Sequence, residues 1–288
     1  MGSSETRFFI DTPDGHAIET FVWLPPQEPR AAVQIVHGMA EHARRYRHVA
    51  AALNDAGYAV YAAEHRGHGQ SAQDGGTLGD FGPRGFDVVP DDMAAVSTEI
   101  HRRHPRCKLV MLAHSMGSFA AQIYLLRHAA LVDGVALSGT SALDLLDPRI
   151  SGWTVEKANA GVGTPRTSAD WLSRDPAVPD AYVADPLCGF DLTLPSLFSI
   201  FDAGRATNRV EELRHIPKDL PLYLFTGDRD PVNGYLAWFD ALVQRLREAG
   251  LRDVSTHVYG GARHEVLNET NRDEVIAQLL AWTARVTR

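Results

Sequence analysis

The segment Lys108-Leu-Val-Met-Leu-Ala-His-Ser-Met-Gly-Ser-Phe-Ala-Ala-Gln-Ile-Tyr124 predicts how the rest of the chain folds. It joins an apolar run of strand length to a helix-forming run through a very tight turn at Ser115. Small residues flank the turn, with Ala113 two positions before the serine and Gly117 two positions after it. This spacing is typical of a strand–turn–helix elbow, which exposes the serine hydroxyl at a helix N-terminus. A serine that only caps the helix would be the simpler alternative.

Composition places the chain among ordinary globular proteins. Its 288 residues are 44% hydrophobic and 22% charged, and no apolar run reaches the length of a membrane span. The formal charge of -8 disfavours nucleic acid as a partner, because phosphate binding needs a basic surface. Cys107 and Cys188 do not suggest a disulfide framework or a metal site with thiolate ligands. Residues 1–6 lack the pattern of a secretory signal, so a cytoplasmic protein with reduced thiols is expected.

Apolar runs of strand length alternate with helix-forming runs along most of the chain. This alternation predicts the α/β class, a mostly parallel central sheet with helices on both faces. Residues 7–15 and 17–24 are expected to form an antiparallel hairpin at its edge. The other expected strands are 31–36, 58–63, 108–114, 134–138, 221–226 and 254–259, and the expected helices are 46–56, 86–104, 234–249, 270–286 and the one that follows Ser115. Residues 74–85 are glycine-rich and are expected to be a surface loop.

The alternation stops between residues 140 and 210, where prolines are frequent and no strand pattern occurs. Short helices are expected around residues 153–160, 168–174 and 196–208. The segment is short, and its apolar side chains need cover from the main body: Trp153, Trp171, Leu187, Phe190, Leu197, Phe198, Ile200 and Phe201. The predicted organisation is therefore a core formed by residues 1–139 and 211–288, with residues 140–210 inserted as a helical cap, or lid.

The order of polar residues after Ser115 predicts a catalytic triad. A serine hydroxyl becomes a nucleophile only with a base beside it, and the base needs an acid to orient it. The loop after the next-to-last expected strand contains Asp228 and Asp230, and the loop after the last one contains His264. The other downstream histidine beyond that acid loop, His257, falls inside an expected strand. We favour Asp230 as the acid, with Asp228 as a residue that closes a turn.

Acyl transfer also requires N–H groups that stabilise the negative charge on the substrate oxygen. One candidate is Met116, directly after the serine. The other is Met39, in the loop that follows the strand ending at Val36, where Gly38 allows a close approach of the backbone. An ordinary strand-to-helix turn would explain Gly38 but not its coincidence with the elbow.

Five motifs occur together along the chain: His37-Gly-Met-Ala-Glu-His42 with Arg45-Tyr46, Arg66-Gly-His-Gly-Gln-Ser71, His114-Ser-Met-Gly117, Gly227-Asp-Arg-Asp230 and Gly260-Gly-Ala-Arg-His264. Together they resemble the monoacylglycerol lipase and lysophospholipase group of serine α/β-hydrolases, also called serine aminopeptidase-like, over essentially the whole chain. The resemblance implies an α/β-hydrolase fold and a variable cap over an acyl-binding groove. It implies the catalytic residues Ser115, Asp230 and His264, with oxyanion donors at Met39 and Met116.

Three residues depart from the pattern of that group. Ala113 and Ser118 stand where glycines are usual, and Glu64 stands where an aspartate usually precedes Arg-Gly-His-Gly. None of them removes a catalytic group. The methyl group of Ala113 is expected to crowd the strand against the helix.

The resemblance implies a serine ester hydrolase that needs no metal and no cofactor. Its expected substrate is a small ester or lipid, a monoacylglycerol or a lysophospholipid in the first place. A small-ester carboxylesterase, an amidase or peptidase with the same triad, and a catalytically silent binding protein remain as alternatives. The apolar cap fits transient contact with a lipid surface and fits a fully packed cap equally well.

Overall fold

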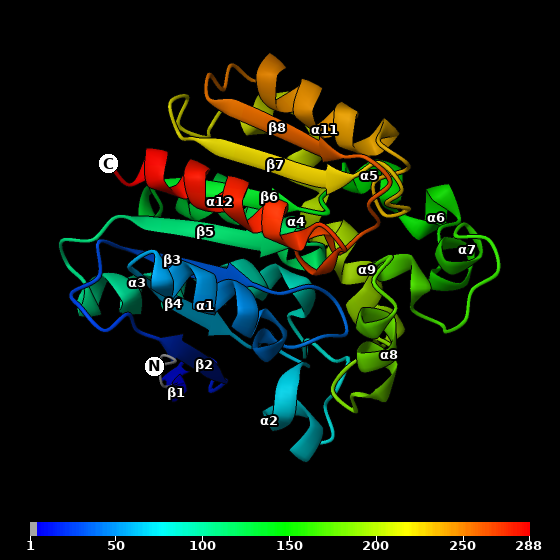
Figure 1. Ribbon diagram of the computed structural model, residues 1–288, viewed down its shortest axis with the longest axis horizontal. Coiled ribbons are helices and arrows are strands. Elements are labelled where there is room, and N and C mark those ends of the chain that lie inside the picture. Colours follow the sequence, from blue (N-terminus) through cyan, green and yellow to red (C-terminus); the bar gives the residue numbers. More distant parts are fainter. Residues whose placement is uncertain (1–4) are drawn as a thin grey trace.

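One eight-stranded sheet, in the order β1-β2-β4-β3-β5-β6-β7-β8, organises the computed structural model, which describes residues 5–288 (Figure 1). The hairpin β1-β2 is antiparallel and joins β4 in antiparallel pairing, whereas all later neighbours are parallel. The predicted fold class and edge hairpin are confirmed. The expectation about a signal sequence falls largely on residues 1–4, outside the described range. The strands are β1 (Glu5–Asp11), β2 (Ala17–Trp23), β3 (Ala31–Val36), β4 (Tyr58–Ala63), β5 (Leu109–His114), β6 (Gly134–Ser138), β7 (Leu222–Gly227) and β8 (Val254–Tyr259).

Helices cover both faces of the sheet because its central strands are buried on both sides. Every residue of β3, β5, β6 and β7 is buried, as apolar parallel strands require. On one face, side chains such as Leu53 and Leu279 form a core with the sheet; on the other, Val96, Ile123 and Leu242 do so. The first face carries α1 (Arg47–Asp55) and α12 (Arg272–Val286), and the second carries α3 (Val89–Arg103), α4 (Met116–His128) and α11 (Ala237–Glu248).

The chain between β6 and β7 contains helices and no strand. We call residues 140–210 the cap segment; in Figure 1 it lies beyond the arrowheads of the sheet, where the parallel strands end. Helices occur near two of the three predicted places, and residues 168–174 contain only a short 3-10 turn. The segment comprises α5 (Leu143–Leu146), α6 (Pro148–Ser151), α7 (Val155–Ala160), η4 (Asp170–Leu172), α8 (Ala177–Ala184), α9 (Leu194–Ala203), η5 (Gly204–Asn208) and the start of α10 (Val210–Leu213).

Two local features differ from the sequence-based expectation. Helix α8 was not expected, because Pro179 disfavours a helix; it lies in the first turn, where backbone N–H groups have no helical acceptor. The surface-loop prediction for residues 74–85 is wrong at Phe81, which is only 1% exposed and whose N–H donates to Ser196 Oγ of the cap segment. The remaining short elements are η1 (Ala43–Tyr46), α2 (Gly69–Asp74), η2 (Gly85–Val88), η3 (Ala129–Leu131) and η6 (Val266–Asn268).

Within residues 5–288, none of the helices combines the length and the apolar character needed to cross a bilayer. The loops that leave the carboxyl ends of β3, β5, β7 and β8 gather at one edge of the sheet, because parallel strands end on the same side. This edge faces the cap segment in Figure 1. It contains the residues singled out from the sequence.

Candidate active site

The turn between β5 and α4 has the strained backbone expected of an elbow. Ser115 lies at φ 50° and ψ -122°, a conformation that L-residues rarely adopt. Its N–H donates to Ser138 O at 2.9 Å, which ties the turn to β6. A Cβ on Gly117 would lie 2.4 Å from His37 O and 2.5 Å from Val36 O. Only glycine allows this contact between the elbow helix and the end of β3.

The three departures from the family pattern all have defined contacts. Ala113 is fully buried within β5. Ser118 Oγ donates to Ser115 O at 2.6 Å, so this side chain satisfies a carbonyl of the elbow. Glu64 Oε2 accepts the N–H of Ala43 at 3.1 Å and lies 3.2 Å from His37 Nε2. None of these contacts displaces the elbow serine.

The structure brings Ser115, His264 and Asp230 into one line of hydrogen bonds. His264 Nε2 lies 2.8 Å from Ser115 Oγ, and His264 Nδ1 lies 2.9 Å from Asp230 Oδ2. Asp230 is fully buried, and its Oδ1 accepts the N–H of Val232 at 2.8 Å. With Nδ1–H donated to the carboxylate, Nε2 is free to accept the serine proton.

The other candidate acid has a different partner. Asp228 Oδ1 accepts the N–H of Gly261 at 2.7 Å, and its side chain is one-third exposed. It therefore ties the loop after β7 to the loop after β8, which is the turn-closing alternative considered from the sequence. Only Asp230 contacts His264 among the two aspartates.

The surroundings of His264 raise its pKa above the ordinary value of 6.5. Burial alone would lower the pKa, but the charge of Asp230 and its hydrogen bond favour the protonated ring, as do Glu265 and Glu41. Trp171 of the cap segment stacks on the ring at 5.0 Å between centroids. His264 is therefore enclosed, and its pKa is higher than that of a free imidazole.

A second histidine, His114, lies beside His264, and its pKa is lowered instead of raised. The ring of His114 lies 4.8 Å from that of His264, and its Nδ1 lies 3.2 Å from Ser138 Oγ. Burial, and then the charge of His264, lower the pKa of His114 to about 4. It is thus neutral at neutral pH and adds no positive charge beside the base.

The loop of residues 37–42, which we call the oxyanion loop because it contains the predicted oxyanion donor Met39, lies against the elbow. A Cβ built on Gly38 would be 3.2 Å from Ser115 Cβ, so the loop passes close to the serine just before Met39. Met116, the other predicted donor, is the first residue of helix α4. Ala40 adopts φ 51°, and its N–H donates to His68 Nε2 at 3.1 Å. Ala40 O accepts from Tyr182 Oη at 2.8 Å and from Gly189 N at 2.9 Å, two donors of the cap segment.

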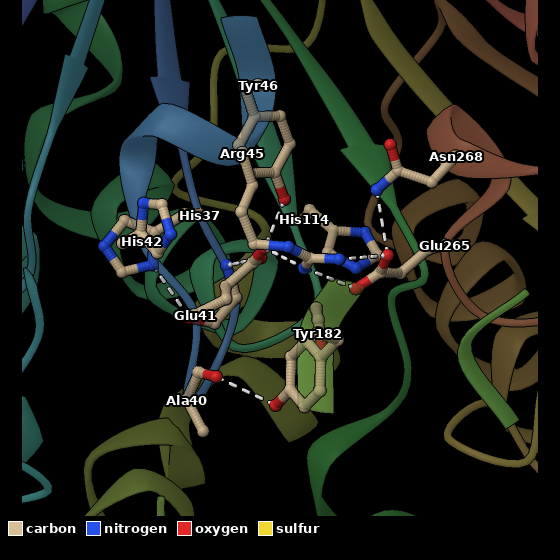
Figure 2. A network of polar contacts seen from close by, with 12 residues as sticks. His37, Ala40, Glu41, His42, Arg45, Tyr46, His114, Tyr182, Glu265 and Asn268 are labelled. Atoms are coloured by element: carbon tan, nitrogen blue, oxygen red, sulfur yellow. Dashed lines mark hydrogen bonds and ion pairs between the residues drawn. The ribbon is translucent and has the colours of Figure 1, made fainter. Parts of the chain in front are cut away.

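A buried ion cluster connects the oxyanion loop to the loop that carries the base. Arg45 donates to Glu41 Oε2 at 2.6 Å and to Glu265 Oε1 and Oε2 at 2.7 and 2.8 Å (Figure 2). Glu41 Oε1 accepts the Gly38 N–H at 2.5 Å. The ring of Tyr182 lies 5.0 Å from the Arg45 guanidinium, so the cap segment covers this cluster.

Sequence reasoning missed three residues that shape this site. His68 belongs to the Arg66-Gly-His-Gly motif and was given no role from the sequence, yet it accepts the Ala40 N–H. Trp171 was assigned to cap packing, and Tyr182 was not singled out. The motif itself was a signal for His68, whereas nothing local in the sequence indicates that Trp171 or Tyr182 reaches the site.

The chain is similar to known proteins over most of its length. A family model described as serine aminopeptidase, S33, matches residues 27–271. The chain is 32% identical to a monoacylglycerol lipase of Mycolicibacterium smegmatis, over 91% of this chain and 90% of that protein. It is 27% identical to a Homo sapiens monoglyceride lipase, over 95% of this chain and 89% of that protein. The crystal structure of a thermostable carboxyl esterase from Bacillus coagulans superposes with a TM-score of 0.90 at 29% identity, covering 99% of both chains.

Proposed function

Because the chain belongs to the serine aminopeptidase S33 family of α/β-hydrolases, we propose that it cleaves monoacylglycerols through an acyl-enzyme on Ser115. The chain is a serine ester hydrolase of the lipase and esterase type. The observation that carries the proposal is the continuous set of hydrogen bonds from Ser115 through His264 to Asp230.

The proposed reaction uses the same groups of the site in both half-reactions. His264 Nε2 takes the proton of Ser115 as Oγ attacks the ester carbonyl carbon. The N–H groups of Met39 and Met116 stabilise the resulting oxyanion. When the C–O bond breaks, His264 protonates the departing alcohol. Water, deprotonated by the same ring, then attacks the acyl-enzyme and releases the carboxylic acid and the free serine.

The cap segment supports a lipid substrate in this proposal. Three large apolar side chains of the segment are exposed: Ile150 at 74%, Leu194 at 65% and Val183 at 53%. Exposed apolar groups favour contact with an acyl chain or a lipid surface. We include in the proposal that residues 140–210 act as the lid, that it contacts lipid surfaces transiently, and that the protein is cytoplasmic.

The decisive experiment is intact-mass analysis after treatment with a fluorophosphonate. We expect one covalent adduct on the wild-type chain and none on Ser115→Ala, because only an activated serine attacks the phosphorus centre. A folded wild-type chain that acquires no adduct would contradict the proposal and favour the silent binding protein. An adduct that persists in Ser115→Ala would place the nucleophile elsewhere.

A small-ester carboxylesterase is the second candidate, supported by the similarity to the Bacillus coagulans esterase. Comparing kcat/KM for monoacylglycerols of increasing chain length, p-nitrophenyl acetate and the matching amides separates the possibilities. We expect kcat/KM to rise with acyl length because each buried methylene adds apolar contact. Highest activity on the acetate would support the carboxylesterase, and activity on amides would support the amidase.

A further inference from the structure

Three side chains with metal-binding atoms meet where the oxyanion loop joins the cap segment. His42 comes from the end of the oxyanion loop, and Asp185 and Cys188 follow helix α8. One ligand atom from each of the three lies within 4.8 Å of the others. We propose that His42, Asp185 and Cys188 bind a divalent cation that accepts nitrogen and sulfur ligands, such as Zn²⁺, and that the bound ion holds the cap segment against the oxyanion loop.

The donor set fits this type of cation, and the separation of His42 and Asp185 is close to that of two zinc ligands. Imidazole nitrogen, carboxylate oxygen and thiolate sulfur are the ligands that Zn²⁺ uses in proteins. His42 Nε2 lies 3.0 Å from Asp185 Oδ2. Two ligands at tetrahedral zinc, with bonds of about 2.0–2.2 Å, lie about 3.3–3.5 Å apart. A shift of a few tenths of an ångström would therefore admit the ion between these two side chains.

Two features hold the ligands in place before an ion arrives. Asp185 Oδ1 accepts the N–H of Leu187 at 2.9 Å, which fixes the carboxylate and leaves Oδ2 directed at His42. The ring of His42 is buried, which restricts its movement away from Asp185.

The charges around Cys188 also favour a cation. Three carboxylates, those of Glu41, Asp185 and Glu265, act on the Cys188 thiol, against one guanidinium, that of Arg45. The surroundings are therefore net negative. When the cation binds, the Cys188 thiol gives up its proton to solvent as the metal–sulfur bond forms.

The position of the site defines its effect on the enzyme. Tyr182 Oη and Gly189 N already connect the cap segment to Ala40 O. An ion shared by His42, Asp185 and Cys188 would add a cross-link between the same two segments. Since a lid must open to admit substrate, the ion is expected to slow hydrolysis; this consequence rests on the proposed function.

Zinc binding is best measured by competition with a chromophoric chelator, on chelator-stripped wild type, Cys188→Ser, Asp185→Asn and Cys107→Ser. Cys107 is the matched control, since it is the chain's other cysteine and lies outside the cluster. We expect one zinc per chain for the wild type and Cys107→Ser, and at least about tenfold weaker binding for the other two. Absence of stoichiometric binding to the wild type, or equal binding to Cys188→Ser, would overturn the site.

Hydrolysis measured with and without zinc separately tests whether the bound ion holds the cap segment closed. We expect zinc to inhibit the wild type and Cys107→Ser but not Cys188→Ser. Zinc that binds at the cluster without slowing hydrolysis would overturn the proposal that the ion holds the cap segment closed. Zinc-free enzyme that hydrolyses no ester would count against the proposed function, whereas the binding measurement would still decide the metal site.

Discussion

The two sides of the active site are held by different parts of the molecule. The triad residues lie on loops that directly leave β5, β7 and β8, and they contact one another at 2.8 and 2.9 Å. The oxyanion loop is held instead by side chains and backbone groups from distant segments, His68 on one side and Tyr182 and Gly189 of the cap segment on the other. The sheet therefore fixes the triad, whereas the oxyanion loop depends on where the cap segment lies.

Backbone strain at Ala40 means that the oxyanion loop needs the support of these contacts. Ala40 adopts a positive φ without being glycine, which costs about 1–3 kcal/mol. Its N–H and its carbonyl are both bonded, and these bonds offset that cost. Loss of the cap-segment contacts would remove part of the support, so displacement of the cap segment is expected to disturb the oxyanion loop before it disturbs the triad.

The largest expected effect comes from breaking the triad side. Asp230→Asn keeps the size of the side chain but removes the charge that orients and stabilises protonated His264, and we expect kcat to fall about 10⁴-fold. Asp228→Asn is the matched control. We expect its kcat to fall about twofold or less, because Asp228 contacts Gly261 instead of His264. Comparable losses in the two variants, measured by steady-state kinetics, would contradict the assignment of the acid.

The pH profile sharpens the same assignment. His264 must be neutral to accept a proton, and its pKa is raised above 6.5. The acidic limb of kcat/KM is therefore expected to have its midpoint above 6.5, with activity lost as the pH falls through it. Residual activity of Asp230→Asn should show a lower midpoint, because the charge that raises the pKa is gone. An unchanged midpoint would argue that another group controls the limb.

The next largest effect comes from breaking the link between the two sides. Arg45→Met leaves Glu41 and Glu265 buried without a cation, and we expect the free energy of unfolding to fall by about 3–5 kcal/mol at pH 7. Burial opposes ionisation of Glu41, but Arg45 and nearby histidines lower its pKa to about 2. In the variant both carboxyl pKa values rise, so the deficit should shrink as the pH falls from 7 towards 5.

Arg47→Met is the control for this measurement. It is the same substitution on an exposed ion pair with Glu5, so a change of about 1 kcal/mol or less is expected in urea denaturation. Equal losses for the two variants would show that the buried cluster does not hold the two loops together.

The smallest effect comes from loosening only the oxyanion side. Tyr182→Phe removes the hydroxyl that donates to Ala40 O and keeps the ring over Arg45. One neutral hydrogen bond contributes about 0.5–1.5 kcal/mol, so kcat should fall about two- to tenfold with a smaller change in KM. Asp180→Asn, which weakens only an exposed ion pair with Arg166 and lies on the same helix, is the control. A kcat loss no larger than that of the control would contradict the claim that the oxyanion loop depends on contacts with the cap segment.

The sequence by itself determined the central sheet and indicated the three residues of the proposed triad. The strands at 31–36, 58–63 and 134–138 coincide with the predicted ranges, because apolar runs of that length must be buried between helices. The strand at 254–259 also coincides with its predicted range, although most of its residues are not buried, because it lies at the edge of the sheet. Ser115, Asp230 and His264 could be proposed because each follows a strand in a fixed order, and Gly117 marks a contact that excludes any side chain. These are local signals.

Only the tertiary structure decided how the oxyanion loop is held. Helix α8 contains a proline and gave no helical signal, yet it presents Tyr182 to Ala40. His42, Asp185 and Cys188 come from two segments far apart in the chain, so no spacing in the sequence could reveal that they meet. Residues that act through long-range contacts leave no periodic pattern, because their positions follow from the packing of the cap segment on the sheet edge.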